Sequence, residues 1–323
     1  MAQTKILPSD DVLYTDEFAS AVIEGLGATQ KNIPCQYLYD AAGSDLFEDL
    51  TYLEEYYPTR TEIALLEKHA GDIAEMTDDG ALLVEFGSGS SRKTNILLEE
   101  MKNIAAYIPI DISDAALEDA EGRLNTQFPK LKVIPIHTDF NQDVDLPEDY
   151  SSAYRLGFFP GSTLGNFERD KARQFLEHSR GILGPKSGFI IGVDLQKDPS
   201  VLVPAYDDAK GVTAKFNLNV LNRINSDLDG TFDLDKFRHR AIYNEQEARV
   251  EMHIESLEDQ EVKVLGQSVN FAQGETIHTE NSHKYTVASF EKLAAAAGWS
   301  VVQTWIDDGQ LFSVHYLRPS QSV

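Results

Sequence analysis

The stretch VEFGSGSSRKT, from Val84 to Thr94, carries the strongest structural signal in this chain. Residues 81–86 form an apolar run that predicts a buried strand, and a helical pattern starts after the glycines. Gly87 and Gly89 predict a tight turn between them, where the backbone can approach a ligand closely. The helix that follows favours anionic groups at its N-terminus. We therefore expect a ligand-binding turn of an α/β protein.

Short apolar runs and helical patterns alternate from Gly80 to Leu195, which predicts a parallel sheet with helices on both faces. The expected strands are residues 81–86, 106–111, 131–138, 154–160 and 188–195. Near the C-terminus, a helical pattern over 287–298 precedes two further strands, 299–306 and 311–317, joined by an Asp-Asp-Gly turn. The sheet is thus predicted to end in an antiparallel hairpin.

Two helix starts are visible from their capping residues. Thr59 and Glu62 have the spacing of a capping box, in which each side chain bonds the other's backbone N–H. Ser113 is expected to cap the helix that follows the second strand.

The alternation breaks between Lys197 and His283, where two helical stretches and two long alternating runs, 248–257 and 260–275, appear. The first 60 residues also lie outside the sheet pattern. We expect residues 1–60 and 197–283 to form a second, α+β domain that binds the substrate. The parallel sheet would then belong to residues 61–196 and 284–323.

Composition limits the classes of function. The 53 acidic and 28 basic residues give a net charge of −25, which disfavours binding to nucleic acid or to anionic membranes. No segment approaches the ~20 apolar residues that span a bilayer. Cys35 is the only cysteine, so neither an intrachain disulfide nor a thiolate metal cluster is expected. We expect a soluble, cytoplasmic, monomeric protein.

The residues around the glycine turn indicate which ligand it holds. A dinucleotide fingerprint needs a third glycine, but position 92 is arginine. Asp111 ends the second strand and could accept hydrogen bonds from ribose hydroxyls, while Asp139 and Phe140 follow the third strand and could hold an adenine. Open α/β sheets bind ligands at this edge. Together with Glu85 before the turn, the pattern favours S-adenosylmethionine over a nicotinamide dinucleotide.

Several longer motifs resemble one known family, the histidine-specific Nα-methyltransferases of ergothioneine biosynthesis, from about Lys31 to the C-terminus. The segments that carry the resemblance are YDAAGSDLFEDL, LEEYYPTRTE, FGSGSSRKT, PIDIS, FPGSTLGNF, AYDDAKGVTAKFNLNVL and TENSHKY. The resemblance implies a Rossmann-like class I methyltransferase sheet. It also implies transfer of three methyl groups from S-adenosylmethionine to the α-amino nitrogen of L-histidine and its partly methylated forms, giving hercynine.

The resemblance also assigns site residues. For the methyl donor it implies Gly87, Lys93, Asp111, Asp139 and Phe140, to which the strand and turn pattern adds Glu85 and Gly89. For histidine it implies Tyr56, Asn166, Tyr206, Glu280 and Ser282, with Tyr39, Phe47, Gly161, Thr213 and Met252 nearby. Tyr56 and Asn166 are the expected catalytic residues, because they would orient the amine. Glu280 and Ser282 are two apart, so on a strand both would face one imidazole.

Other interpretations remain open from the residues alone. Asn166 could be an ordinary turn asparagine, and Tyr56 and Tyr206 could be half-buried tyrosines with satisfied hydroxyls. His278, Glu280 and His283 could suggest a metal site, but no metal-binding motif accompanies them and we expect no metal. Ser162 lacks the sequence context of a nucleophilic serine. The functional alternatives are a tryptophan methyltransferase, a nicotinamide dehydrogenase and a non-catalytic amino-acid sensor.

Overall fold

The computed structural model describes residues 11–89 and 92–320. The chain forms two compact units, and each is built from segments that are distant in sequence. Unit 1 contains Met1–Tyr56 and Asp198–Asn281, and unit 2 contains Tyr57–Lys197 and Ser282–Val323. The junctions thus differ from the predicted domain boundaries by a few residues.

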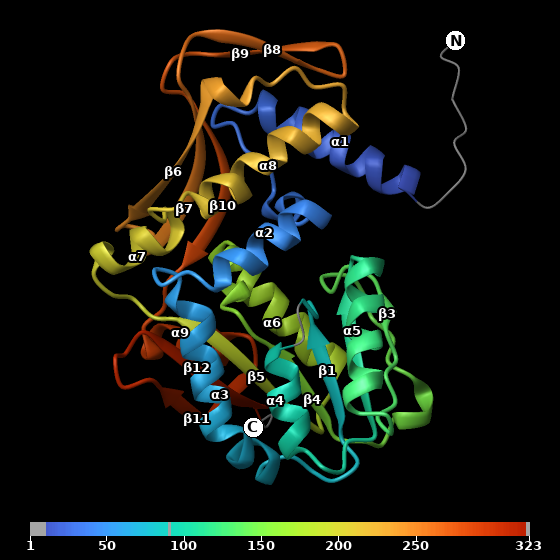
Figure 1. Cartoon of the computed structure of the whole chain (residues 1–323). Helices are drawn as coiled ribbons and strands as arrows, with labels where there is room; N and C mark the ends of the chain where they lie inside the picture. The colour runs from blue at the N-terminus through green and yellow to red at the C-terminus, as the bar shows by residue number, and fades with distance from the viewer. Residues whose placement is uncertain (1–10, 90–91, 321–323) are drawn as a thin grey trace. The chain divides into compact units, whose positions relative to one another are not determined.

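Unit 2 contains a seven-stranded sheet in the order β11-β12-β5-β4-β1-β2-β3 (Figure 1). Its strands are β1 (Leu82–Phe86), β2 (Ala106–Asp111), β3 (Ile136–His137), β4 (Arg155–Phe159), β5 (Ser187–Asp194), β11 (Trp299–Ile306) and β12 (Phe312–Pro319). The first five are parallel, whereas β12 runs antiparallel to both β5 and β11. The predicted α/β sheet with a C-terminal antiparallel hairpin is confirmed.

Strand β3 is shorter than the predicted strand over 131–138. Val133 forms only an isolated bridge with Tyr107, and regular pairing with β2 is restricted to Ile136 and His137. Pro135 lies between Val133 and Ile136, and it has no N–H to donate to the hydrogen-bond ladder. The proline therefore interrupts this edge of the sheet.

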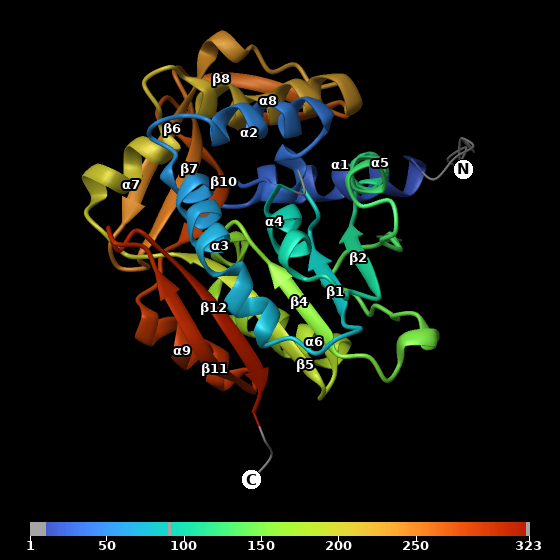
Figure 2. The same ribbon diagram turned by 60° about the horizontal axis from the view of Figure 1, so that its bottom comes forward.

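Helices cover both faces of the sheet, as the alternation along β1 requires. Leu82, Val84 and Phe86 pack with α6 (Arg169–Leu183) and α9 (Val287–Ala296). Leu83 faces the other core, which includes residues of α3 (Tyr57–Glu75), α4 (Arg92–Glu100) and α5 (Asp114–Gln127). Figure 2 shows α3 lying along the strands of this sheet. The 3-10 turns η2 (Glu148–Tyr150) and η3 (Thr163–Asn166) lie in the loops before and after β4.

The two predicted helix caps differ in outcome. Ser113 caps α5, because its hydroxyl accepts a hydrogen bond from Ala116 N at 3.2 Å. The predicted capping box of Thr59 and Glu62 is wrong, since α3 already begins at Tyr57. Glu62 lies within the helix, and its carboxylate is used elsewhere.

Unit 1 is an α+β structure. Its strands β6 (Phe237–Asn244), β7 (Arg249–Ser256) and β10 (Thr276–His283) form a sheet in the order β10-β7-β6, and β8 (Gln260–Val264) pairs with β9 (Gln267–Phe271). Helix α8 (Val212–Asp227) packs against α2 (Ala41–Thr51) and β6, and α7 (Pro199–Tyr206) also contacts β6 (Figure 1). The other elements are α1 (Asp11–Gly27), η1 (Cys35–Leu38) and η4 (Leu234–Lys236).

Strand β10 continues through the junction at Asn281 and Ser282, so its last two residues belong to unit 2. Among the described residues, the structure has no helix with both the length and the apolar character needed to cross a membrane.

Candidate functional site

The glycine turn after β1 has the backbone that a close-fitting ligand requires. Gly87 and Gly89 have φ angles of 79° and 41°, which favour glycine over residues with a side chain. A Cβ built on Gly87 would lie 3.7 Å from the Phe140 ring, and one on Gly89 would meet nothing within 4 Å. Ser90 and Ser91, the end of the turn, lie outside the described residues. Among the described residues, no atom therefore blocks the approach of a ligand to Gly89.

Asp111, at the end of β2, fixes the turn from the neighbouring strand. Its Oδ2 accepts a hydrogen bond from Ser88 N at 3.0 Å, and its Oδ1 accepts one from Ser113 N at 3.0 Å. Asp139 organises its own loop, because Oδ1 accepts from both N and Nδ2 of Asn141 at 2.8 Å. Both carboxylates are partly exposed, so they retain lone pairs that a ligand could use.

Phe140 is packed edge-on into an aromatic cluster at the same edge of the sheet. Its ring centroid lies 5.6 Å from Phe175, 5.8 Å from Phe159 and 6.5 Å from Phe86. These contacts hold a flat apolar side chain beside Gly87, where the sequence predicts the adenine.

Glu85 differs from the other predicted donor-site residues because it is 2% exposed. Its carboxylate accepts hydrogen bonds from Tyr107 and, at 2.7 Å, from Thr94 of α4. Burial raises the pKa of Glu85 to about 8. The side chain thus joins β1, β2 and α4 beneath the turn.

Glu62 is a site residue that the sequence interpretation missed. Its carboxylate is 1% exposed and accepts hydrogen bonds from Gly161 N at 2.8 and 3.0 Å. Lys93 Nζ pairs with the same carboxylate at 2.5 Å. One acid in α3 therefore connects Lys93, predicted for the donor site, with Gly161, predicted for the histidine site. Its spacing along α3 gave no signal of these contacts, which are 31 and 99 residues away in sequence.

A buried charged cluster lies around Asp194, the last residue of β5. Its carboxylate accepts hydrogen bonds from Tyr57 at 2.8 Å, and ion pairs join it to Lys197 at 2.5 Å and to Lys284 at 2.7 Å. Burial lowers the pKa of Lys197 to about 8. Lys284 also donates to Ser282 Oγ at 2.8 Å.

The loop after β4 is tied to the same cluster. Asp194 N donates to Ser162 Oγ at 2.9 Å, and Ser162 itself has a φ of 57°. A Cβ on Gly165 would lie 2.8 Å from the carbonyl oxygen of His283, so this loop touches the end of β10. Asn166, at the end of η3, is thereby placed on a firmly held loop and is only partly buried.

The predicted histidine-site residues of unit 1 gather in an aromatic cluster. The ring centroid of Tyr39 lies 5.4 Å from Phe47 and 5.3 Å from Phe216, and Phe47 lies 6.2 Å from Tyr56. Tyr56 in turn lies 6.1 Å from Tyr206. These tyrosines come from separate segments of the sequence, and their rings are linked by a chain of ring contacts.

Glu280 of β10 belongs to this cluster. Tyr39 Oη donates to Glu280 Oε2 at 3.5 Å, and the carboxylate is 8% exposed. Burial and the charge of Glu280 together raise the pKa of Tyr39 and raise that of Cys35 to about 12. A buried carboxylate next to this aromatic cluster is suited to accept a hydrogen bond from an N–H donor.

Two further predicted residues of unit 1 are buried in its framework. Met252 is 2% exposed, and its carbonyl oxygen accepts from Thr279 Oγ1 at 3.0 Å. Thr213, also 2% exposed, donates its N–H to Asp208 at 2.7 Å at the start of α8.

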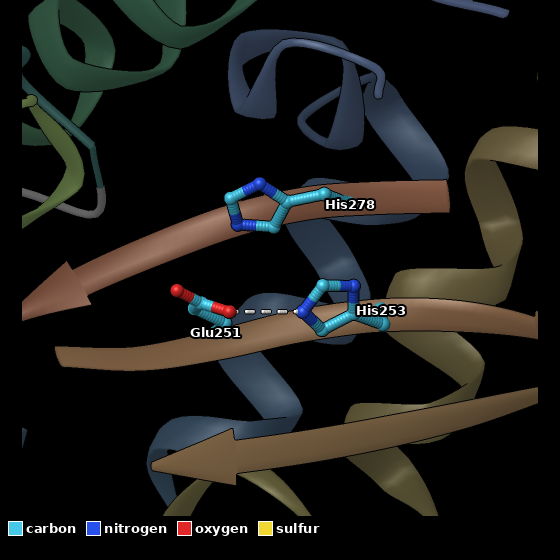
Figure 3. Close-up of side chains that lie close together, drawn as sticks. All are labelled: Glu251, His253 and His278. Carbon is cyan, nitrogen blue, oxygen red and sulfur yellow. Dashed lines mark hydrogen bonds and ion pairs between the residues drawn. The ribbon is translucent and has the colours of Figure 1, made fainter. Parts of the chain in front are cut away.

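Within the described part of the chain, the side chains that could offer ligands to a metal differ from the set His278, Glu280 and His283. Glu251 and His253 of β7 and His278 of β10 offer ligand atoms within 4.8 Å of one another (Figure 3). Arg249 Nε donates to Glu251 at 2.7 Å, and the two imidazole rings stack with centroids 4.8 Å apart and planes 22° from parallel. A cation would compete with Arg249, and stacked rings do not converge their lone pairs. We assign these groups to the packing of β7 against β10.

The structure thus brings the predicted residues together as two sets. Unit 2 contains the residues predicted for the donor site. It also contains Gly161, Asn166 and Ser282, on segments held by Glu62 and the Asp194 cluster. In unit 1 the structure assembles Tyr39, Phe47, Tyr56, Tyr206 and Glu280.

Comparison with known proteins agrees with these features. The profile of a family described as histidine-specific methyltransferase, SAM-dependent, matches residues 18–319. The chain is 38% identical over 289 residues to the histidine N-alpha-methyltransferase of Mycolicibacterium smegmatis, covering 88% of this chain and 89% of that protein. It is 36% identical over 298 residues to the enzyme of the same name from Mycobacterium tuberculosis, covering 91% and 92%. A more distant relative, 26% identical with 96% and 95% coverage, is the L-tryptophan methyltransferase of Psilocybe serbica.

Proposed function

Because the chain belongs to the family of SAM-dependent histidine-specific methyltransferases, we propose that it methylates the α-amino nitrogen of free L-histidine. Three transfers give hercynine, the trimethylated betaine, which is a step in ergothioneine biosynthesis. The observation that carries this proposal is the extent of the family match. It includes the glycine turn of unit 2 and also the cluster of unit 1 formed by Tyr39, Phe47, Tyr56, Tyr206 and Glu280. A match to the sheet alone would have indicated only a methyltransferase.

S-adenosylmethionine, when bound, supplies an electrophilic methyl group, so the chain's own residues mainly position the acceptor and exclude water. We propose that Asp111 bonds the ribose and that Lys93 bonds the donor's carboxylate. Asp139 and Phe140 would hold the adenine. The donor-site residues in this proposal are Glu85, Gly87, Gly89, Lys93, Asp111, Asp139 and Phe140.

Histidine is proposed to be held by its two ends, which leaves its nitrogen free to turn between transfers. Tyr206 and Asn166 would bond the α-carboxylate, while Glu280 and Ser282 would bond the imidazole. Each transfer removes a hydrogen that the amine could donate, so contacts at the two ends must keep the substrate in place. The surrounding walls in this proposal are Tyr39, Phe47, Gly161, Thr213 and Met252.

The amine must lose a proton before each of the three transfers, since an α-amino group has a pKa of about 8 in water. We propose that Tyr56 and Asn166 orient it so that its lone pair points at the donor. The Tyr56 ring is fixed by edge contacts with Phe47 and Tyr206. Catalysis would then depend on orientation, and no covalent intermediate with the protein is needed.

The imidazole end is proposed to determine specificity. Glu280 is buried, and a buried carboxylate left without its partner costs about 1–3 kcal/mol or more. An amino acid without a ring N–H could not donate this hydrogen bond to Glu280, and a bulkier indole would need a larger pocket.

The proposal further includes a monomeric, cytoplasmic enzyme that acts on free amino acids and requires no metal. Its support is the net charge of −25, which disfavours polyanionic partners, and the sulfonium's own electrophilicity. Gel filtration tests whether the protein is a monomer. Activity measured after treatment with a chelator tests whether it requires a metal.

A competition experiment tests the substrate. The protein is incubated with S-adenosylmethionine and an equimolar pool of the common amino acids, and mass spectrometry identifies the products. We expect histidine alone to gain methyl groups. Methylated tryptophan with unchanged histidine would establish the alternative, and consumption of neither would show that the protein is not this enzyme.

A further inference from the structure

Asn217 and His239 form a buried polar pair inside unit 1 that no step of the proposed reaction uses. Asn217 lies on α8 and is 0% exposed, and His239 lies on β6 and is 9% exposed. The atoms Asn217 Nδ2 and His239 Nδ1 are 2.9 Å apart. Burying an amide and an imidazole is costly unless their polar atoms are hydrogen-bonded. The other contacts of the pair therefore indicate what it holds in place.

The pair connects two segments that carry proposed contacts to histidine. On one side, His239 Nε2 lies 2.7 Å from the carbonyl oxygen of Tyr206, the last residue of α7. The last carbonyls of a helix have no donor within the helix, and His239 supplies one here. On the other side, Asn217 Oδ1 accepts from Thr279 Oγ1 at 2.6 Å. Thr279 precedes Glu280 on β10, so three hydrogen bonds lead from Tyr206 to the neighbour of Glu280.

The direction of these hydrogen bonds follows from groups that can act in only one way. A carbonyl oxygen only accepts, so His239 Nε2 carries a hydrogen that points to Tyr206. Asn217 Nδ2 also lies 3.1 Å from the carbonyl oxygen of His253, which assigns this atom as the NH₂ group of the amide. Its two hydrogens then point to the His253 carbonyl and to His239 Nδ1. His239 Nδ1 is therefore an acceptor, and the ring is neutral with its hydrogen on Nε2.

Other arrangements of hydrogens conflict with this geometry. An imidazolium ring would direct Nδ1–H at the NH₂ group of Asn217, so that two donors would face each other. Turning the amide over would remove that conflict, but it would place Asn217 Oδ1 against the carbonyl oxygen of His253. Burial lowers the pKa of His239, and this effect outweighs the charges of Asp207 and Asp208, which act in the opposite direction. The hydrogen bonds and the burial thus both favour the neutral ring.

We infer that Asn217 and neutral His239 are positioning residues that fix Tyr206 relative to Glu280 within unit 1. This inference rests on the proposed function, in which Tyr206 bonds the α-carboxylate of histidine and Glu280 bonds its imidazole. These two groups lie at opposite ends of the substrate, so the spacing of the two residues must match its length. Loosening Tyr206 should therefore weaken histidine binding and leave the methyl-donor site of unit 2 unchanged.

Two substitutions of His239 test this role, because each keeps a different part of its hydrogen bonding. His239→Gln places an NH₂ group near the position of Nε2 and can still donate to Tyr206. His239→Asn is shorter and reaches only to the position of Nδ1, so it loses that hydrogen bond. We expect KM for histidine to rise about 10-fold in His239→Asn and less than about 3-fold in His239→Gln, with kcat little changed in both. Equal increases in the two variants, or a change in kcat alone, would overturn the inference.

A matched pair of substitutions on α8 separates positioning from general destabilisation. Asn217→Asp keeps the shape of the side chain but replaces its NH₂ group by an oxygen, so His239 should take up a proton and KM for histidine should rise about 10-fold. Asn225→Asp is the control, because Asn225 bonds the backbone N–H and carbonyl of Phe232, both at 2.8 Å. We expect this control to change KM less than about 2-fold, even where it lowers stability. An equal rise in KM in both variants would refute the positioning role.

Nitrogen NMR of the unaltered protein, with labelled histidine rings, covers the case in which His239→Asn and Asn217→Asp do not fold. The signals of His239 are those lost in His239→Gln. At about pH 6.5, where an ordinary histidine is half protonated, we expect His239 to be neutral with its hydrogen on Nε2. An imidazolium, or a hydrogen on Nδ1, would overturn the inference, while methylation of histidine by the same protein would leave the proposed function in place. Failure of the unaltered protein to bind and methylate histidine would instead overturn both.

Discussion

Glu62→Gln tests whether one buried acid holds two segments of unit 2 together. These are the segment of Lys93, which is proposed to bind the methyl donor, and the segment of Gly161, which is proposed to line the histidine site. The substitution keeps the side chain's size but removes the charge that faces Lys93 at 2.5 Å and the N–H of Gly161 at 2.8 Å. Breaking a buried ion pair by removing one partner costs about 3–5 kcal/mol. Since the Lys93 side chain is 15% exposed, we expect the lower end. The free energy of unfolding should therefore fall by about 3 kcal/mol.

Ligand binding should change in the same variant, because Lys93 and Gly161 lose their common partner. We expect the dissociation constant for S-adenosylhomocysteine to rise about 10-fold, which corresponds to about 1.4 kcal/mol. Urea unfolding followed by circular dichroism gives the stability, and calorimetry gives the affinity.

The matched control is Glu177→Gln, which removes an exposed ion pair with Arg173 inside α6. Exposed pairs at this spacing contribute about 0.3–0.5 kcal/mol, so both measurements should stay close to those of the unaltered protein. If Glu62→Gln behaved like this control, the structural role assigned to Glu62 would be refuted.

Three further predictions concern other parts of the structure. Gly192→Ala should lower the unfolding free energy by about 3 kcal/mol or more, because its Cβ would lie 1.9 Å from Glu62 Oε1; a normal urea midpoint would contradict this. Glu280→Gln should weaken histidine binding about 100-fold, from the loss of a charged hydrogen bond of about 3 kcal/mol, while donor affinity changes less than about 2-fold. Equal losses in calorimetry would exclude Glu280 as the imidazole partner. Burial lowers the pKa of His315 to about 3, below its usual 6.5, so only the unfolded chain binds this proton between those values. Stability should therefore decrease as pH falls below 6.5, and less steeply in His315→Gln; parallel melting curves against pH would contradict this.

Local signals were sufficient to predict the sheet of unit 2. Its strands are continuous apolar runs separated by glycine turns and helical stripes, and each of these patterns depends on neighbouring residues only. The exception, β3, also has a local cause, because Pro135 removes one hydrogen-bond donor from an edge strand.

The connections within the site could not be predicted from local patterns. Glu62 matched a capping box, whereas its true partners are Lys93 and Gly161 in distant segments. The contact of Lys284 with Asp194 joins residues 90 positions apart, and nothing in the sequence around either one indicates it. Helix capping depends on neighbouring residues, while a buried ion pair depends on the tertiary fold. The site residues themselves were proposed from the family resemblance. A family resemblance can assign residues that are distant in sequence to the same site, which local patterns cannot do.

The central claim is that the protein transfers three methyl groups to the α-nitrogen of histidine, and one measurement tests it most directly. L-Histidine labelled with ¹⁵N only at the α-amine is incubated with S-adenosylmethionine, and the product is analysed by mass spectrometry and nitrogen NMR. The account predicts one product carrying three methyl groups on the labelled nitrogen, with three molecules of S-adenosylhomocysteine released for each. Methylation of a ring nitrogen, or unchanged histidine beside intact donor, would contradict it.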